Sequence, residues 1–147
     1  IVYLFMNKIL VEVSVGELLD KISILEIKQD KIKDLEKLKF IKEEHSILND
    51  QLKKNIKTDK KLDELFKNLK EINSKLWVIE DDKRNCEKEK DFSDKFIRLS
   101  RDVHFLNDDR AKIKLEINNY TGSKIKEMNK GFFNYFGKIG HWFDENL

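Results

Sequence analysis

The arginines are the residues whose type and position most suggest a chemical role in this sequence. Only four of the 30 basic residues are arginines, and all four lie in the second half of the chain. A guanidinium group is planar and binds a carboxylate or a phosphate through two parallel hydrogen bonds, which a lysine cannot do. We therefore expect specific contacts with acidic side chains or with a bound anion. The candidate ligand-binding residues are Arg84, Arg98, Arg101, Arg110 and Glu80.

Arg110 stands out because it falls on the apolar stripe of its predicted helix. A buried charge is costly unless it is paired. We predict that Arg110 pairs with a carboxylate, chiefly on the helix predicted before it, and thereby fixes how the two helices align. The alternatives are an anion or small-ligand site between these helices and a side chain that extends into solvent. The acidic partners considered are Glu80, Asp81, Asp82, Glu87, Asp102, Asp108 and Asp109.

Other kinds of chemistry find little support. The three histidines, His45, His104 and His141, are far apart and lack the spacing of metal ligands. His45 falls on the apolar stripe of its predicted helix and is expected to be a core histidine whose polar atoms are hydrogen-bonded. The single cysteine, Cys86, excludes an internal disulfide and is expected to be a small buried apolar residue. No glycine-rich phosphate loop occurs. We assign no catalytic residue, metal or cofactor, and favour a non-enzymatic protein over an enzyme.

The elements that must position these residues are predicted to be long helices. The chain lacks proline, 39% of its residues are charged, and four of its five glycines lie at or beyond residue 122. The fold class is therefore all-α, with antiparallel coiled-coil-like hairpins or a helix bundle. Acidic and basic residues alternate closely and leave a net charge of only +2, which argues against a nucleic-acid partner.

Two helices are predicted in the first half of the chain. Ser14 and Glu17 have the spacing of a capping box, so a helix should begin near Val15. The apolar spacing slips after Ile32, which predicts a turn near residues 33–36 with Asp34 as the next cap. One continuous helix over 15–56 is the alternative.

Two longer helices are predicted in the second half. Apolar residues from Leu62 to Cys86 and from Phe92 to Tyr120 recur at steps of mostly 3 and 4, with a break near residues 90–91 and a stop at Gly122. Because the connection is short, the two helices should pack antiparallel. Their stripes are narrow and leave apolar flanks uncovered, so we expect a homodimer, with another protein as a further candidate partner.

The chain divides into three predicted parts. Residues 1–14 form an extended arm or short strand, residues 15–122 the helical bundle, and residues 123–147 an aromatic-rich tail. No apolar run is long enough for a membrane span. The apolar start has no basic leader, and Met6 is a candidate first residue. We expect a cytoplasmic protein.

The tail carries an aromatic stripe at helical spacing. Phe132, Phe136, Ile139 and Phe143 follow one another at steps of 4, 3 and 4. We predict that the tail docks on its own bundle or on a partner subunit. The alternative is contact with a membrane surface through Phe132, Phe136, Trp142 and Phe143.

Several blocks of the sequence resemble a known family. They are VEVSVGELLDKISILEIK (11–28), LWVIEDDKRNCE (76–87), DFSDKFIRLSRDV (91–103) and NDDRAKIKLEIN (107–118). Together they resemble an uncharacterised bacterial family known as a domain of unknown function. The resemblance covers about residues 10–123, implies a short extended start before the first helix, and supplies no activity. Residues after 128 depart from the pattern.

The function is therefore unknown at the level of the sequence. The hypothesis we favour is a non-enzymatic helical module for oligomerisation or protein interaction. The alternative is a small-anion-binding protein or enzyme with an arginine-lined site between the helices predicted over 62–86 and 92–120.

Overall fold

A computed structural model describes residues 7–128, and this part of the chain folds into four helices. They are α1 (Val15–Lys31), α2 (Leu35–Asn55), α3 (Lys60–Glu89) and α4 (Asp94–Thr121). The prediction of an all-α fold is confirmed. Residues 7–14 form neither helix nor strand. The aromatic stripe of the tail lies outside the described residues.

The helices begin where local side chains cap them. Ser14 Oγ accepts a hydrogen bond from the Glu17 N–H at 3.0 Å, and Asp34 caps α2 in the same way through the Lys37 N–H at 3.0 Å. The predicted start at Val15 and the predicted turn before α2 are therefore confirmed, and residues 15–56 are two helices.

The ends of the two long helices are set by left-handed residues. α4 stops at Gly122, with φ of 66°, as predicted. α3 stops at Lys90, with φ of 57°, a conformation that a residue other than glycine adopts at some cost. The short turn that follows lets α3 and α4 run antiparallel.

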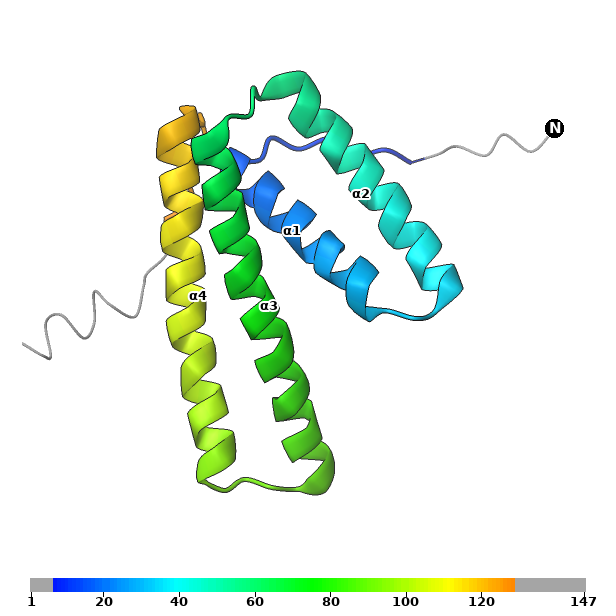
Figure 1. Cartoon of the computed structure of the whole chain (residues 1–147), viewed down its shortest axis with the longest axis vertical. Helices are drawn as coiled ribbons and strands as arrows, with labels where there is room; N and C mark the ends of the chain where they lie inside the picture. The colour runs from blue at the N-terminus through cyan, green and yellow to red at the C-terminus, as the bar shows by residue number, and fades with distance from the viewer. Residues whose placement is uncertain (1–6, 129–147) are drawn as a thin grey trace, which may run out of the picture.

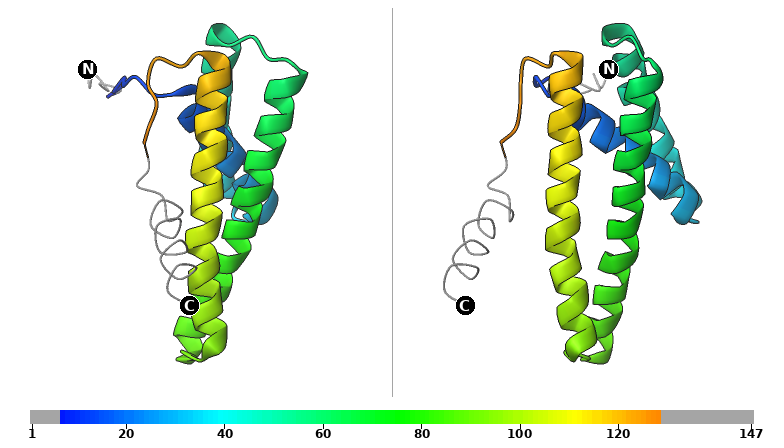
Figure 2. Two further views of the ribbon diagram at one scale, coloured as in Figure 1. Left: turned by 90° about the vertical axis from the view of Figure 1, so that its left-hand side faces the viewer. Right: turned by 60° about the vertical axis from the view of Figure 1, so that its left-hand side comes forward.

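The helices stack in three layers (Figure 1). α3 and α4 lie side by side as one long hairpin, and α1 packs against both of them in the half that contains the start of α3 and the end of α4. The backbone of α2 runs beside α1 alone among the described helices. Figure 2 shows from two other sides that the α3–α4 turn extends well beyond α1.

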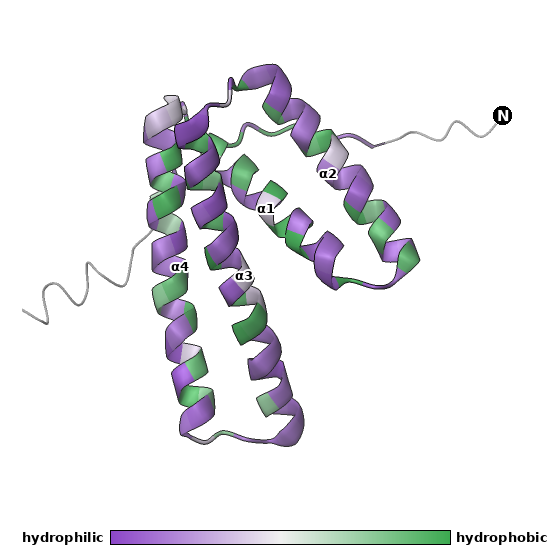
Figure 3. Cartoon of the chain, viewed as in Figure 1, coloured by the Kyte–Doolittle hydropathy of each residue, from purple (hydrophilic) through white to green (hydrophobic). Residues whose placement is uncertain are grey.

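The core lies where α1 crosses the hairpin. Its buried residues are Leu19, Ile22, Leu52, Leu62, Leu65, Leu69 and Ile117. Beyond α1 lies what we call the distal hairpin, residues 76–106, in which only Leu76 and Cys86 are buried. Apolar patches nevertheless continue along both helices there (Figure 3). Within residues 7–128, no helix combines the length and apolar character needed to span a membrane.

Candidate functional site

A buried ion pair joins α1 to the hairpin. The side chain of Asp20 is 2% exposed. Its Oδ1 accepts a hydrogen bond from Arg110 Nε at 2.8 Å, and its Oδ2 accepts one from Arg110 Nη2. The pair has the two-pronged geometry expected of a guanidinium group. The hydrogen bond with Asp20 raises the pKa of Arg110, while burial acts in the opposite direction.

Two further polar side chains complete this contact. Asn73 of α3 donates through Nδ2 to Asp20 Oδ1 and to Ser23 Oγ, each at 2.8 Å. The Ser23 hydroxyl donates to the Asp20 carbonyl at 2.8 Å. Both side chains are buried. We call Asp20, Ser23, Asn73 and Arg110 the polar junction. An external anion at Arg110 would have to displace Asp20.

A second set of contacts lies about one helical turn from the polar junction on both α1 and α4. Lys114 Nζ lies 2.5 Å from Glu17 Oε2, and the Gly16 N–H donates to Asn118 Oδ1 at 2.7 Å. The helices approach closely here, since a Cβ atom on Gly16 would stand 2.6 Å from the Lys114 carbonyl oxygen. The two sets together align α1 antiparallel to α4.

Residues 123–128, which we call the strap, also hold the start of α1. Ser123 Oγ accepts a hydrogen bond from the Val15 N–H at 3.2 Å. The Glu127 carboxylate accepts from Ser14 Oγ at 2.7 Å and from Asn118 Nδ2 at 3.3 Å. Partial burial would raise the pKa of Glu127, but these hydrogen bonds and the charge of Lys114 outweigh it and lower that pKa.

Glu26 links α1 to both α2 and α3. Its carboxylate lies 2.7 Å from Lys70 Nζ and 3.6 Å from His45 Nε2. The Nε2 atoms of His45 and Gln29 are both buried, and neither makes a hydrogen bond within the described part of the chain. The prediction of a satisfied core histidine is therefore wrong, because the His45 side chain is 24% exposed and its Nε2 atom has no hydrogen-bond partner among the described residues. No group of three metal-ligating side chains occurs among residues 7–128.

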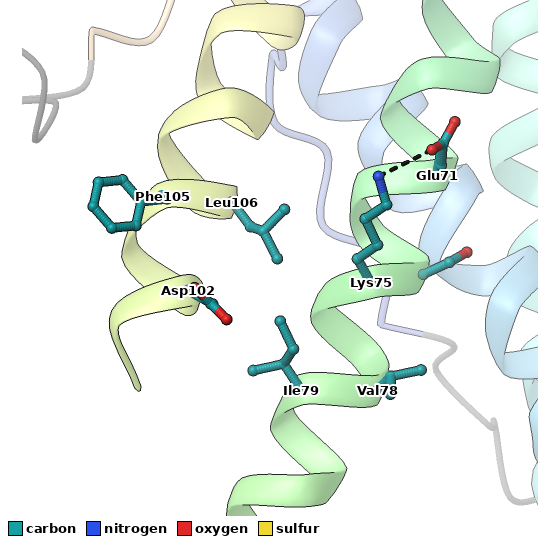
Figure 4. A pocket seen from close by; sticks show the side chains of 8 residues that line it. Glu71, Lys75, Val78, Ile79, Asp102, Phe105 and Leu106 are labelled. Atoms are coloured by element: carbon teal, nitrogen blue, oxygen red, sulfur yellow. Dashed lines mark ion pairs between the residues drawn. The ribbon is translucent and has the colours of Figure 1, made fainter. Parts of the chain in front are cut away.

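An apolar groove of about 650 Å³ runs between α3 and α4. Leu106 and Ile79 point toward each other across it, while Phe105 and Val78 lie at its outer edges (Figure 4). Lys75 forms an ion pair with Glu71 at 3.0 Å on the α3 side. The groove is lined by Glu71, Ser74, Lys75, Val78, Ile79, Asp102, Phe105 and Leu106.

This groove lies on the face of the hairpin that is turned away from α1. Lys70 and Asn73 contact α1, whereas Lys75 and Val78, each five residues further along α3, line the groove. Five residues correspond to a rotation of about 140° around a helix. The hairpin is thus covered on one face and open on the other.

A family model described as a family of unknown function, DUF6165, matches residues 9–138. The chain belongs to DUF6165. No curated protein matches it, and no solved structure matches it. The DUF6165 match contains all four helices and extends beyond residue 123, where the sequence resemblance ends. The expectation that residues after 128 depart from the family pattern is therefore wrong as far as residue 138.

The prediction for the partner of Arg110 in this DUF6165 chain is wrong. The expected partner was a carboxylate of α3, or one of three in α4, but the observed partner is Asp20 of α1, 90 residues away in sequence. The reason is geometric. Arg110 lies on the face of the α3–α4 hairpin that α1 covers, so its guanidinium reaches a third helix.

The other candidate site residues do not gather around Arg110. Arg84 pairs with Asp81 of the same helix at 3.1 Å and is 75% exposed. Glu80 lies 3.8 Å from Lys83 rather than beside an arginine. Arg98 and Arg101 are exposed on α4, and none of the four arginines lines the groove. Anion binding by this set stays a prediction.

Cys86 lies where the sequence predicted it. It is a free cysteine in the distal hairpin and is 1% exposed. It fills space between α3 and α4 as a small apolar side chain.

Proposed function

We propose that this DUF6165 member is a non-enzymatic helical assembly module that forms a homodimer through the open face of the α3–α4 hairpin. The observation that carries the proposal is a change in burial between the part of the hairpin under α1 and the part beyond it. Leu65 and Leu69 of α3 are buried in the core with α1 residues, whereas Leu106 of α4 is only half-buried although it points toward Ile79 of α3 (Figure 4). Two helices alone cannot close their apolar stripes, and a further helical layer would complete them.

The open face is large enough for a stable dimer. α3 has 30 residues and α4 has 28, so the face is about 45 Å long. With a width of about 20 Å for two helices, it offers about 900 Å². A standard protein interface buries about 800 Å² on each partner. α1 and α2 lie on the opposite face and would not obstruct a second copy.

The charges beside the groove favour a second copy of the chain as the partner. Glu71 and Lys75 lie on the α3 side and Asp102 on the α4 side, so both signs are present. A strongly acidic or basic partner would meet like charges on this surface. A two-fold related copy can place its α3 over the first copy's α4 and meet opposite charges, which gives an antiparallel four-helix bundle.

The test is the molar mass of the full chain in solution, measured by light scattering after size-exclusion chromatography. We expect a dimer at micromolar concentration. Val78 is 52% exposed in the groove, so Val78→Glu should leave the fold intact and weaken the dimer at least about tenfold because it buries an unpaired charge. The matched control is Ile47→Glu on α2, where Ile47 is 57% exposed.

Two results would contradict the proposal. One is a wild-type chain that stays monomeric at about 100 μM, a concentration well above the dissociation constant of a stable interface. The other is equal dissociation by Val78→Glu and Ile47→Glu, since the second variant changes a distant surface. Circular dichroism of both variants checks that the helices are retained.

A further inference from the structure

We propose that residues 7–13, which we call the arm, form an antiparallel β-ribbon with the arm of a second copy of the chain, centred on Leu10. The arm precedes α1, and α1 lies on the face of the hairpin opposite to the groove. The contact is therefore separate from the proposed dimer and does not depend on it. The DUF6165 match begins at residue 9, so most of the arm belongs to the family pattern.

The backbone of the arm has no hydrogen-bonding partner among the described residues. The chain makes neither a turn nor a bend over residues 7–14, and it runs away from the hairpin (Figure 1). No backbone N–H or carbonyl group of the arm makes a hydrogen bond within residues 7–128. These are the groups that an added strand pairs. No strand lies within residues 7–128 to pair with them.

The apolar side chains of the arm lie in solvent in the single chain. Ile9 is 87% exposed, Leu10 is 80% exposed and Val11 is 74% exposed, whereas Val13 is 44% exposed. β-Branched side chains suit a strand because they pack against neighbours across a sheet. The three β-branched residues alternate in sequence, so they share one face of an extended arm.

The charges of the arm select one way of pairing it with its own copy. Lys8 and Glu12 lie two residues before and after Leu10, on the same face of the arm as Leu10. If two arms run antiparallel with Leu10 opposite Leu10, Lys8 of each copy lies opposite Glu12 of the other. On the second face, Ile9 then lies opposite Val11. Opposite charges and β-branched side chains are both favourable cross-strand pairs.

Other alignments of two arms lose these pairs. A parallel ribbon in register places Lys8 beside Lys8 and Glu12 beside Glu12, and like charges destabilise a sheet. An antiparallel ribbon centred on Lys8 or on Glu12 again opposes like charges. The registers between these place a charged side chain opposite an apolar one. An arm that is complementary to itself fits a two-fold contact between identical chains, whereas the edge strand of an unrelated protein would not require this symmetry.

The contact is expected to be weak. Glu12 lies 3.7 Å from Lys124 in the single chain, but both side chains are exposed, so this ion pair offers little competition. An isolated two-stranded ribbon is only marginally stable in water. Arm pairing therefore adds a contact between molecules at high concentration and does not alter the dimer expected at micromolar concentration. A covalent cross-link can trap it.

Disulfide trapping in the full-length chain tests the alignment. All variants carry Cys86→Ala, which removes the native thiol, and Val78→Glu, which weakens the proposed dimer. Under mild oxidation, Leu10→Cys should form an interchain disulfide at least about tenfold faster than Ile9→Cys or Val11→Cys, because only residue 10 lies opposite itself. Ile9→Cys and Val11→Cys chains should cross-link faster when mixed than when separate. All three side chains are largely exposed, so random collision would give similar rates.

Charge reversal tests the pairing of Lys8 with Glu12. In the Leu10→Cys chain, Lys8→Glu should slow cross-linking about three- to tenfold, because both cross-strand pairs then oppose like charges. Adding Glu12→Lys to that chain should restore the rate. Lys39→Glu on α2 changes the net charge by the same amount and is the matched control. It should leave the rate unchanged.

Two results would overturn the inference. One is an equal rate of cross-linking for the three single-cysteine chains, which would show that exposed thiols collide at random. The other is a failure of Glu12→Lys to restore the rate that Lys8→Glu had lowered, which would show that the two residues do not face each other. Neither result depends on whether the open face of the hairpin forms a dimer.

Discussion

At the scale of single residues, Asp20 is the side chain on which the contact between α1 and the hairpin depends most. Removing it as Asp20→Ala leaves Arg110 and Asn73 without their shared acceptor. Loss of one partner of a buried pair typically costs about 3–5 kcal/mol, and we expect at least about 3 kcal/mol here. Urea unfolding followed by circular dichroism measures the change.

The control for Asp20→Ala is Asp81→Ala, which also removes the partner of an arginine. Arg84 is 75% exposed, so this change should cost less than about 1 kcal/mol. Equal effects of the two substitutions would mean that the polar junction does not hold α1.

Gly16 provides a second prediction at the scale of single residues, in which the sign of the change in stability is informative. Alanine is the better helix former by about 1 kcal/mol, so propensity alone predicts that Gly16→Ala stabilises α1. The added Cβ would stand 2.6 Å from the Lys114 carbonyl oxygen, which belongs to the backbone and cannot rotate away. We therefore expect a net loss of about 1–3 kcal/mol in thermal unfolding. Lys21→Ala, on the exposed side of α1, should change the stability by less than about 0.5 kcal/mol.

At the scale of the elements, a contact between the start of α3 and the end of α4 predicts a dependence on pH. Tyr120 donates a hydrogen bond to Asp59 Oδ2 at 2.6 Å. That bond, together with one from the Leu62 N–H, lowers the pKa of Asp59, and the same contact raises the pKa of Tyr120. The stabilisation from Asp59 is present above its unfolded pKa and is lost as the pH falls through the lower folded value. The stabilisation from Tyr120 is present below its unfolded pKa and is lost as the pH rises through the higher folded value.

Tyr120→Phe should therefore lower the unfolding temperature most between about pH 4 and about pH 10, where both groups are in the bonded state. Thermal unfolding over the full pH range measures this. Asp63→Asn, an exposed change in the same turn of α3, serves as the control. A Tyr120→Phe effect that is constant from acid to alkali would contradict the assignment.

The elements also show what a single sequence can predict. The starts of α1 and α2 were predictable because Ser14 and Asp34 bond to backbone groups three residues away. The partner of Arg110 was not, because no local pattern says that α1 crosses the hairpin at this level. The same limit applies to Glu17. Its spacing from Ser14 predicts a capping box, yet its carboxylate pairs with Lys114 of α4, which is distant in sequence.

At the scale of the whole molecule, α2 is the most weakly attached helix. Its backbone lies beside α1 alone among the described helices, and only Ile41 and Leu52 of α2 are buried. Its polar link to the rest of the bundle, His45 with Glu26, spans 3.6 Å. We expect the amides of α2 to exchange with deuterium faster than those of α1, because few buried contacts oppose local opening. Equal protection of α1 and α2 in hydrogen-exchange mass spectrometry would show that the bundle opens as one unit.

The close approach at Gly16 has a consequence for folding accuracy. Because acidic residues on α1 and basic residues on α4 repeat about once per turn, a slip of about 5.4 Å would still give α1 opposite charges to meet. Attraction alone would therefore tolerate a misaligned bundle. A slipped α1 would bring a residue with a side chain against the Lys114 carbonyl, where only hydrogen fits. The close approach at Gly16 therefore disfavours the misaligned packing that charge attraction alone would allow.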